Sequence, residues 1–393
     1  MSIVMRGEKG LTWCNSTKAY RGYTLFAPMG SKDVWLIDMQ GNFVNRWRMP
    51  YKPACHGLLL PNGNLLYAGQ LKSSREWGLP EGGFGGIGGI LLEVDWEGNI
   101  IWKAEVPYQG HDFYPMENGH IMYKEVVYDN RSSKGFLPSE LAAKIIGGRP
   151  GTEFNGEIWG DILVEIDRAG KVVWEWLAYE HLDPEIDTMC PLENRYQWPY
   201  INSVWVCRDG NVLVSCRHEH QIIKIDKATS KVVWRWGKGE LGHQHDCREL
   251  DNGNILIFDN GVHRPTLEPS YSRSVEVNPK TNEIVWQYVA DPPSDFFSAV
   301  CGGCERLPNG NTIICEATSG RMFEVTEKGE LVWEYINPFV GPCASFTSTK
   351  LLFRAHRYGL DYPGLKGKDL DPERFAWANR FWGPTSLSRE IKS

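Results

Sequence analysis

Three histidines occupy one recurring position in the sequence. His111 and His245 each lie eight residues before the glycine of an expected turn, and His56 lies seven residues before another such glycine. Asn202 has the eight-residue spacing in a further segment. Only 10 of the 393 residues are histidine, so chance accounts poorly for this recurrence. Because a neutral imidazole can act as a base, a nucleophile or a metal ligand near neutral pH, the position predicts a functional site.

Two pairs of basic residues lie close to these positions. Arg217 and His218 follow the apolar run in LVSCRHEH, and His263 and Arg264 follow IFDNG. Arginine offers a planar fork of donors to sulfate, phosphate or carboxylate. We therefore expect His218, His263 and Arg264, together with His56, to bind an anionic substrate.

A metal site is the alternative interpretation of the same histidines. His56, His111 and His245 come from separate segments and could together hold zinc, iron or copper with one open coordination position. Such a centre would suit a metal-dependent lyase, hydratase or hydrolase acting on a small aromatic or acidic substrate. The His-x-His pairs at 218–220 and 243–245 would place two imidazoles on one face of a strand, because side chains alternate along a strand.

An internal repeat indicates which elements position these side chains. Six segments share an apolar–turn–apolar form that closes on tryptophan, as in ILVEIDRAGKVVW, and each predicts a β-hairpin. Their tryptophans are Trp47, Trp102, Trp174, Trp234, Trp286 and Trp333. Between them lie five hairpins with Asn-Gly or Asp-Gly turns, whose glycines are Gly63, Gly119, Gly210, Gly253 and Gly310.

The alternation of the two hairpins predicts an all-β fold, a six-bladed β-propeller with four antiparallel strands per blade. We expect GYTLFAP near the N-terminus to pair with a strand inside STKLLFRAHRY and so close the ring.

The longer spacings at 125–160 and 178–200 are expected to be loop insertions, which often carry substrate contacts. We expect a single domain over residues 1–393, with the tail from about 359 to 393 wrapping the outside. In a propeller the first strand of each blade lines the central channel, so equivalent offsets form a ring.

The composition of the chain limits the kinds of partner that we expect it to bind. The net charge of −7, from 42 basic and 49 acidic residues, gives no electrostatic case for binding nucleic acid or an anionic membrane. No apolar stretch approaches the roughly 20 residues that cross a bilayer. Ten cysteines without a secretory signal are expected to be reduced thiols, so we expect a cytoplasmic protein. A homo-oligomer is compatible with this composition.

Three segments resemble the arylsulfotransferase family, the nucleotide-independent enzymes that move sulfuryl groups between phenols. They are WPYINSVWVCRDGNVLVSCRHEHQIIKID, QHDCRELDNGNILIFDNG and RLPNGNTIICEATSGRMFEVTEKGELVWEY. The resemblance extends over most of residues 45–360. It implies a six-bladed propeller, a small aromatic substrate, a covalent sulfohistidine intermediate and no cofactor.

The same resemblance assigns roles to individual residues. His245 matches the family's nucleophilic histidine, Arg217 its sulfate-binding arginine, Asn202 its asparagine and His111 a further active-site histidine. Tyr200 stands where the family has a histidine, and the CGGC stretch replaces an expected threonine. A phenol can donate a hydrogen bond as that histidine would. The residues thus favour an aryl-sulfate sulfotransferase, with a metal-dependent enzyme or a non-catalytic propeller that serves as an interaction platform as the alternatives.

Overall fold

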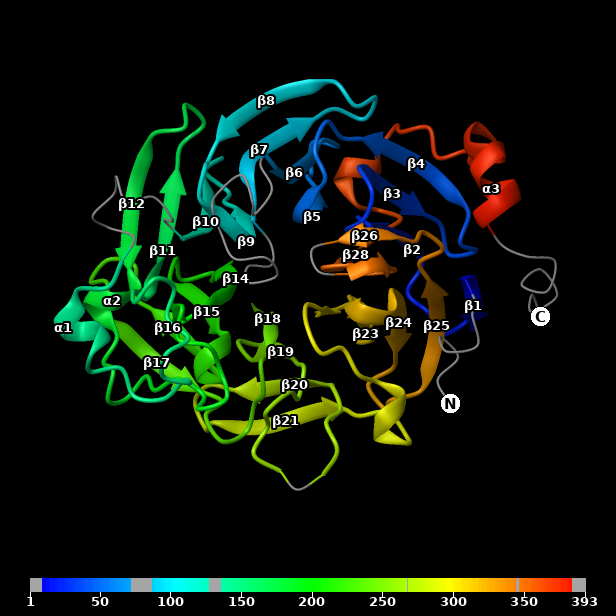
Figure 1. Cartoon of the computed structure of the whole chain (residues 1–393). Coiled ribbons are helices and arrows are strands. Elements are labelled where there is room, and N and C mark those ends of the chain that lie inside the picture. Colours follow the sequence, from blue (N-terminus) through cyan, green and yellow to red (C-terminus); the bar gives the residue numbers. More distant parts are fainter. Residues whose placement is uncertain (1–8, 72–86, 127–135, 267, 344–345, 384–393) are drawn as a thin grey trace. The chain divides into compact units, whose positions relative to one another are not determined.

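The fold is the predicted six-bladed β-propeller, with six antiparallel sheets of four or five strands (Figure 1). The computed structural model of the chain describes residues 9–71, 87–126, 136–266, 268–343 and 346–383. Backbone contacts divide the chain into two compact units with three of these sheets each. Unit 1 comprises Met1–Leu71, Ile90–Ala104 and Tyr288–Ser393, and unit 2 comprises Lys72–Gly89 and Glu105–Gln287.

The first sheet of unit 1 joins the two ends of the chain. β28 (Ala355–Gly359) pairs with β2 (Gly22–Phe26), from Gly22 opposite Gly359 to Phe26 opposite Ala355, which confirms the predicted closure. The sheet continues through β3 (Asp33–Ile37) and β4 (Phe43–Arg48). The second sheet contains β5 (Pro53–Leu59), β6 (Leu65–Gln70), β7 (Gly89–Val94) and β8 (Ile100–Glu105).

The third sheet of unit 1 has a fifth strand that the repeat did not predict. It contains β22 (Gly303–Arg306), β23 (Thr312–Glu316), β24 (Arg321–Val325) and β25 (Leu331–Ile336), and β1 (Gly10–Cys14) pairs with β25. A small ribbon of β26 (Gly341–Cys343) and β27 (Phe346–Thr349) follows. In the tail, α3 (Ala376–Trp382) lies on β4, where the side-chain amide of Asn379 hydrogen bonds both backbone groups of Phe43.

Unit 2 contains the other three sheets. The strands, in chain order, are β9 (Gln109–Pro115), β10 (Ile121–Val126), β11 (Trp159–Ile166) and β12 (Val172–Leu177); β14 (Ile201–Val206), β15 (Val212–Cys216), β16 (Gln221–Ile225) and β17 (Val232–Trp236); and β18 (His245–Glu249), β19 (Ile255–Asp259), β20 (Arg273–Asn278) and β21 (Glu283–Tyr288). The short β13 (Gln197–Trp198) runs parallel to β11.

The glycines of the Asn-Gly and Asp-Gly turns all have left-handed backbone, with φ between 80° and 88°. This conformation is strained for residues with a Cβ atom, which explains the glycine in each copy of the turn. These are Gly63, Gly119, Gly210, Gly253 and Gly310.

The two predicted insertions both lie in unit 2 and pack on each other. They include the short helices α1 (Ser139–Ala142) and α2 (Ala178–His181). Arg195 from the second insertion donates hydrogen bonds to the carbonyls of Ala142 (3.2 Å) and Ile145 (3.1 Å) and pairs with Glu153 at 2.8 Å. The guanidinium thus holds the segment 182–196 in place against the first insertion.

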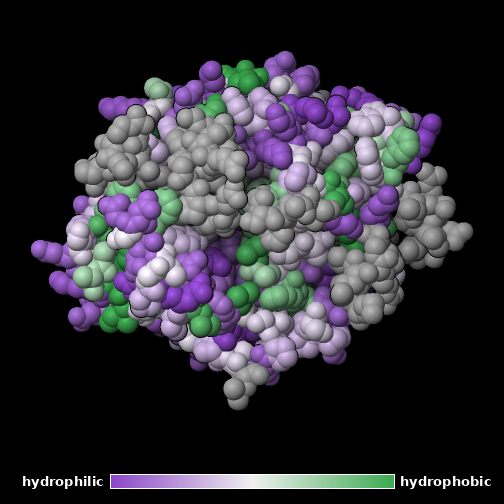
Figure 2. Space-filling view, in the orientation of Figure 1, coloured by the Kyte–Doolittle hydropathy of each residue, from purple (hydrophilic) through white to green (hydrophobic). Residues whose placement is uncertain are grey.

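The face shown in Figure 2 mixes hydrophilic and hydrophobic residues without gathering either kind over one large area. No helix among the described residues is long and apolar enough to cross a membrane. All ten cysteines of the chain are present as thiols.

The tryptophans of the repeat connect neighbouring blades. In four of the six copies, the indole N–H donates to the turn of the next Trp-terminated hairpin within the same unit. The pairs are Trp47 with the carbonyl of Asp95 (2.9 Å), Trp174 with that of Lys227 (3.2 Å), Trp234 with Asn282 Oδ1 (2.9 Å) and Trp333 with the carbonyl of Met39 (3.0 Å). A buried indole fills volume and also satisfies a turn acceptor.

This role of the tryptophans can be measured at Trp47, which is fully buried and also packs edge-on against Trp96. We expect Trp47→Phe to lower the free energy of unfolding by about 2–3 kcal/mol, because it leaves a cavity and removes one of the two hydrogen bonds to the carbonyl of Asp95. Trp13→Phe is the matched control, since Trp13 is 39% exposed and donates a comparable bond to Leu331. Its effect should stay within about 0.5 kcal/mol. Equal losses in urea denaturation of the two variants would contradict the assigned role.

Candidate functional site

The first strands of the three sheets in unit 2 are linked by buried side chains. Asp112 on β9 accepts a hydrogen bond from the backbone N–H of Val204 on β14 at 2.9 Å. Asn202 on β14 donates from Nδ2 to the carbonyl of Gln244, the residue before β18, at 2.8 Å. Asn202 is fully buried. Its hydrogen bond therefore positions the start of β18, where His245 lies, from the interior of the protein.

His245 has a defined tautomer. Its Nδ1 lies 2.7 Å from Oδ1 of Asn260 and 3.1 Å from the carbonyl oxygen of His243. Both partners are acceptors, so Nδ1 carries the proton and the lone pair of the neutral ring is on Nε2. The side chain is only 3% exposed. An imidazole held in this way presents a nitrogen suited to nucleophilic attack.

His111 and Tyr200 lie beside each other in the same unit. Their ring centroids are 5.2 Å apart, with an edge of one ring toward the face of the other. Burial lowers the pKa of His111 well below its ordinary value, and the charges of Lys124, His245 and Arg217 lower it further. His111 is therefore a neutral imidazole that lies close enough to His245 and Arg217 for their charges to affect its pKa.

Arg217 and Glu193 form the polar centre of this region. Nη1 of Arg217 lies 3.2 Å from Oε2 of Glu193, and Nη2 donates to Nδ1 of His243 at 2.8 Å. Oε1 of Glu193 lies 2.6 Å from Nε2 of His243, and Oε2 lies 3.1 Å from Nε2 of His218. Burial by itself would raise the pKa of Glu193, but His218, His243 and Arg217 hold it far below its usual range. Glu193 is thus a buried carboxylate with cationic and N–H partners.

A second buried ion pair flanks Tyr200. Nζ of Lys124 lies 3.0 Å from Oδ1 of Asp161, and both side chains are excluded from solvent. Lys124 Nζ and Arg217 Cζ also lie 5.8 Å and 5.3 Å from the centre of the Tyr200 ring. Cations at this distance from the centre of an aromatic ring make cation–π interactions with it. Each cation near Tyr200 therefore has both a carboxylate partner and an aromatic neighbour.

The predicted substrate-binding residues fall in different places. His218 is fully buried, with Nδ1 on the carbonyl of Gln197 at 3.0 Å. Arg264 pairs with Asp259 at 3.0 Å and donates to the carbonyl of Tyr271 at 2.9 Å. His263 is 30% exposed, and its Nδ1 lies 3.3 Å from Glu193.

His56 belongs to unit 1, whereas His111 and His245 belong to unit 2. Nδ1 of His56 lies 3.1 Å from Nε2 of His356, whose Nδ1 lies 2.5 Å from Oε1 of Glu305. Within unit 1 these three residues form a carboxylate–histidine–histidine chain. The histidine positions that the repeat predicts lie on the first strands β5, β9 and β18, and His356 has the corresponding place on β28.

The predicted metal ligands His56, His111 and His245 are not the ones that the structure groups at ligand distance. Among the described residues, donor atoms of Cys190, His220, His243 and His263 lie within 4.8 Å of one another. The two His-x-His pairs are also not strand pairs. Arg217–Glu219 forms a 3-10 turn, His220 follows it with φ 55°, and His243 precedes β18 with φ 55°. The expected alternation along a strand therefore does not apply to them.

Several residues of the site carry no signal in the repeat. Glu193 and Cys190 come from the second insertion, Lys124 from the second strand of its sheet and Asn260 from the end of β19. Asn260 directly follows the apolar run ILIFD, and a polar residue at a strand end was the one signal available for it.

Comparison with known proteins gives a family and a fold. Residues 58–338 match the family model described as arylsulfotransferase (ASST). The arylsulfate sulfotransferase AssT of Lelliottia amnigena is 22% identical over 386 residues, in a match that covers 69% of this chain and 63% of that protein. The chain thus spans less than two thirds of the length of this curated relative.

Solved structures are similar at low identity. A protein of unknown function from Bacteroides caccae matches with a TM-score of 0.54 and 12% identity, over 86% of this chain and 98% of that one. A catalytically inactive virginiamycin B lyase from Staphylococcus aureus matches with a TM-score of 0.46 and 10% identity, over 86% and 92%. The Bacteroides caccae structure supports the fold. The family follows from the sequence match, because residues 58–338 are more than half of this chain. The chain belongs to the arylsulfotransferase family.

Proposed function

We propose that the chain transfers sulfuryl groups from an aryl sulfate to a phenol through Nε2 of His245. Membership of the family supports a sulfotransferase-like function. The observation that carries the finer proposal is the pair of acceptors, Asn260 Oδ1 and the carbonyl of His243, at Nδ1 of His245. They keep the proton on Nδ1 and so keep the lone pair on Nε2, where a nucleophile needs it.

The first half-reaction forms a sulfohistidine. The Nε2 lone pair attacks the sulfur of the aryl sulfate, the N–S bond forms, and the bond from sulfur to the aryl oxygen breaks. The aryl oxygen leaves with the bonding electrons as a phenolate. The sulfated ring keeps its Nδ1 proton and is positively charged, and the oxygen of Asn260 stabilises this charge as it accepts the proton's hydrogen bond.

The second half-reaction returns the enzyme to its starting state. The oxygen of an acceptor phenol attacks the same sulfur, the N–S bond breaks, and its electrons return to Nε2. The acceptor phenol loses one proton and the released phenolate gains one, so no net proton is consumed. Because the donor product leaves before the acceptor reacts, the kinetics are ping-pong.

Three groups suit the charge that develops on the transferred oxygens. Arg217 has five N–H donors, of which the contacts to Glu193 and His243 use two. His111 is neutral and can donate one hydrogen bond to an oxygen without adding charge. Tyr200, whose ring lies near Lys124 and Arg217, offers a phenol where the resemblance to the family places a histidine. Asn202 acts on the backbone before His245, so it positions the nucleophile.

The covalent intermediate is directly testable. Incubation with p-nitrophenyl sulfate, without an acceptor, should add the mass of one sulfuryl group to the intact chain, because the intermediate then has no phenol to react with. Digestion should place this group on the peptide that contains His245. His245→Ala should lose both the added mass and turnover, whereas His181→Ala, at an exposed histidine of the same unit, should keep both. A wild-type chain that neither gains the mass nor releases p-nitrophenol, or an adduct that persists in His245→Ala, would contradict the proposal.

Asn260 provides a second test, specific to the tautomer. Asn260→Ala removes the closer of the two acceptors at Nδ1 and leaves the carbonyl of His243. We expect kcat to fall about 10²- to 10³-fold with KM nearly unchanged, since losing one preorganised polar group costs about 3–4 kcal/mol of barrier. Asn260→Asp keeps an acceptor oxygen and should recover most of kcat. Steady-state kinetics of the three proteins, with melting temperatures to confirm folding, decide the matter. A change confined to KM, or an aspartate variant as slow as the alanine variant, would show that Asn260 does not act through the tautomer.

A further inference from the structure

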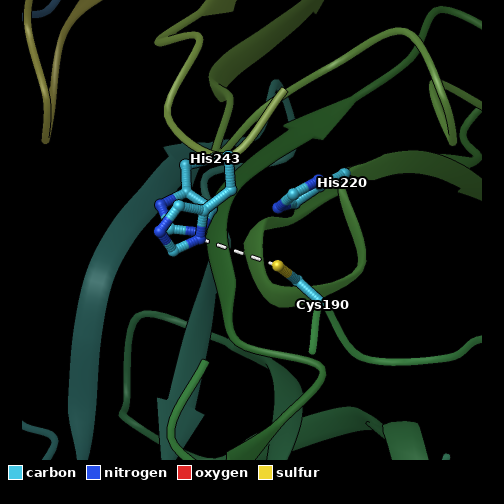
Figure 3. Close-up of side chains that lie close together, drawn as sticks. Cys190, His220 and His243 are labelled. Carbon is cyan, nitrogen blue, oxygen red and sulfur yellow. Dashed lines mark hydrogen bonds between the residues drawn. The ribbon is translucent and has the colours of Figure 1, made fainter. Parts of the chain in front are cut away.

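We propose that Cys190, His220, His243 and His263 bind one divalent transition-metal ion, with zinc the best fit. The sulfur and one ring nitrogen from each histidine lie within 4.8 Å of one another. Figure 3 shows Cys190, His220 and His243 gathered in one place, with the sulfur of Cys190 directed toward the imidazoles. This site shares no ligand with the set that the sequence predicted, and its occupancy does not depend on sulfuryl transfer.

The separations are close to those of a bound ion. Zinc bonds of about 2.0 Å to nitrogen and about 2.3 Å to sulfur place neighbouring ligands of a tetrahedral site roughly 3.3–3.6 Å apart. Nδ1 of His263 already lies 3.6 Å from Sγ of Cys190. The rings of His243 and His263 have centroids 4.5 Å apart, and those of His220 and His243 are 5.1 Å apart. Side-chain rotations of modest size therefore complete the tetrahedron.

The backbone at these residues is fixed in an uncommon conformation. His220, His243 and His263 all have left-handed backbone, with φ of 55°, 55° and 60°. Such conformations in residues other than glycine carry strain and persist where the surrounding structure enforces them, often at functional sites. Cys190 is held by its own backbone N–H, which donates to the carbonyl of His218 at 2.6 Å. Four separate loops of unit 2 thus bring their donors to one point.

His220 points most clearly to a ligand. The side chain is buried, at 8% exposed, and among the described residues its Nε2 has no hydrogen-bond partner. A buried polar nitrogen without a partner is costly, so such atoms usually face an ion or a water molecule.

Glu193 can adapt to a bound ion without losing its other partners. Its Oε1 faces His243 and His263, while its Oε2 faces Arg217 and His218. A neutral imidazole has one lone pair, and that of His243 accepts from Arg217, so His243 exchanges its contact to Arg217 for the metal when an ion binds. The thiol of Cys190 releases its proton to solvent and binds as thiolate. The contacts of Oε2 of Glu193 to Arg217 and His218 remain.

The donor set selects among metals. One thiolate and three imidazoles suit a borderline-soft ion such as Zn²⁺, and disfavour Mg²⁺ and Ca²⁺, which prefer oxygen ligands. Cobalt(II) accepts the same tetrahedral sites and reports its ligands through its absorption spectrum. It therefore serves as the spectroscopic probe.

The test uses the full chain, stripped with a chelator and then dialysed against Zn²⁺ or Co²⁺. We expect one zinc per chain by elemental analysis, an increase in melting temperature with zinc, and a thiolate-to-cobalt charge-transfer band with Co²⁺. Cys190→Ser should lose the band, and His220→Ala should weaken zinc binding at least tenfold. Cys343→Ser and His181→Ala, outside the cluster, should bind as wild type does.

Circular dichroism of each metal-free variant separates loss of a ligand from loss of the fold. Cys190→Ser replaces sulfur with oxygen in a loop, so it tests the site even if a histidine variant unfolds. Binding of less than half an equivalent of zinc by the folded wild-type chain would overturn the proposal. So would a charge-transfer band that survives in Cys190→Ser, or zinc affinity in folded His220→Ala equal to that of wild type.

Discussion

The site in unit 2 depends on one buried carboxylate. Glu193 lies in contact with Arg217, His218, His243 and His263, which come from three different segments of the chain. A carboxylate is costly to remove from water, and only several polar partners with good geometry offset that cost. The four side chains are therefore constrained to meet at this group. Because Arg217 and His243 also contact each other, the carboxylate fixes the arginine that the proposed reaction uses and a histidine of the proposed metal site.

The site residues on the first strands of the sheets could be predicted, because each occupies the same position in a copy of the sequence repeat. The spacing to the turn glycine placed His111, Asn202 and His245 on the first strands of their sheets, and the structure has them there. His356 holds the same position on β28, but that blade is assembled from both ends of the chain and has no Asn-Gly or Asp-Gly turn from which to count. β1 was missed for a related reason, because a single strand added to a finished blade has no hairpin partner next to it in the sequence.

The rest of the site could not be predicted because its chemistry is set by tertiary contacts. Glu193 and Cys190 lie in an insertion without periodicity, and tertiary contacts such as those of Arg195 and of Asp187 with Arg235 hold that segment in place. The left-handed backbone of His220 and His243 decides where their rings point, yet nothing in the sequence marks a histidine as left-handed. This is why the His-x-His pairs, taken as strand pairs, were misplaced.

The repeated strands and the loops that connect them therefore contribute different features to the site. The repeated strands hold His245 through Asn202, which bonds the backbone before it, and Asn260, which bonds its ring, as the proposed attack on a single sulfur atom requires. The insertions and blade loops supply the charged and metal-ligating groups beside it. Loops on a rigid scaffold can change without unfolding it. An identity of 22% to a curated arylsulfate sulfotransferase is consistent with this division, because the blades can keep one architecture while the loops around the histidine diverge.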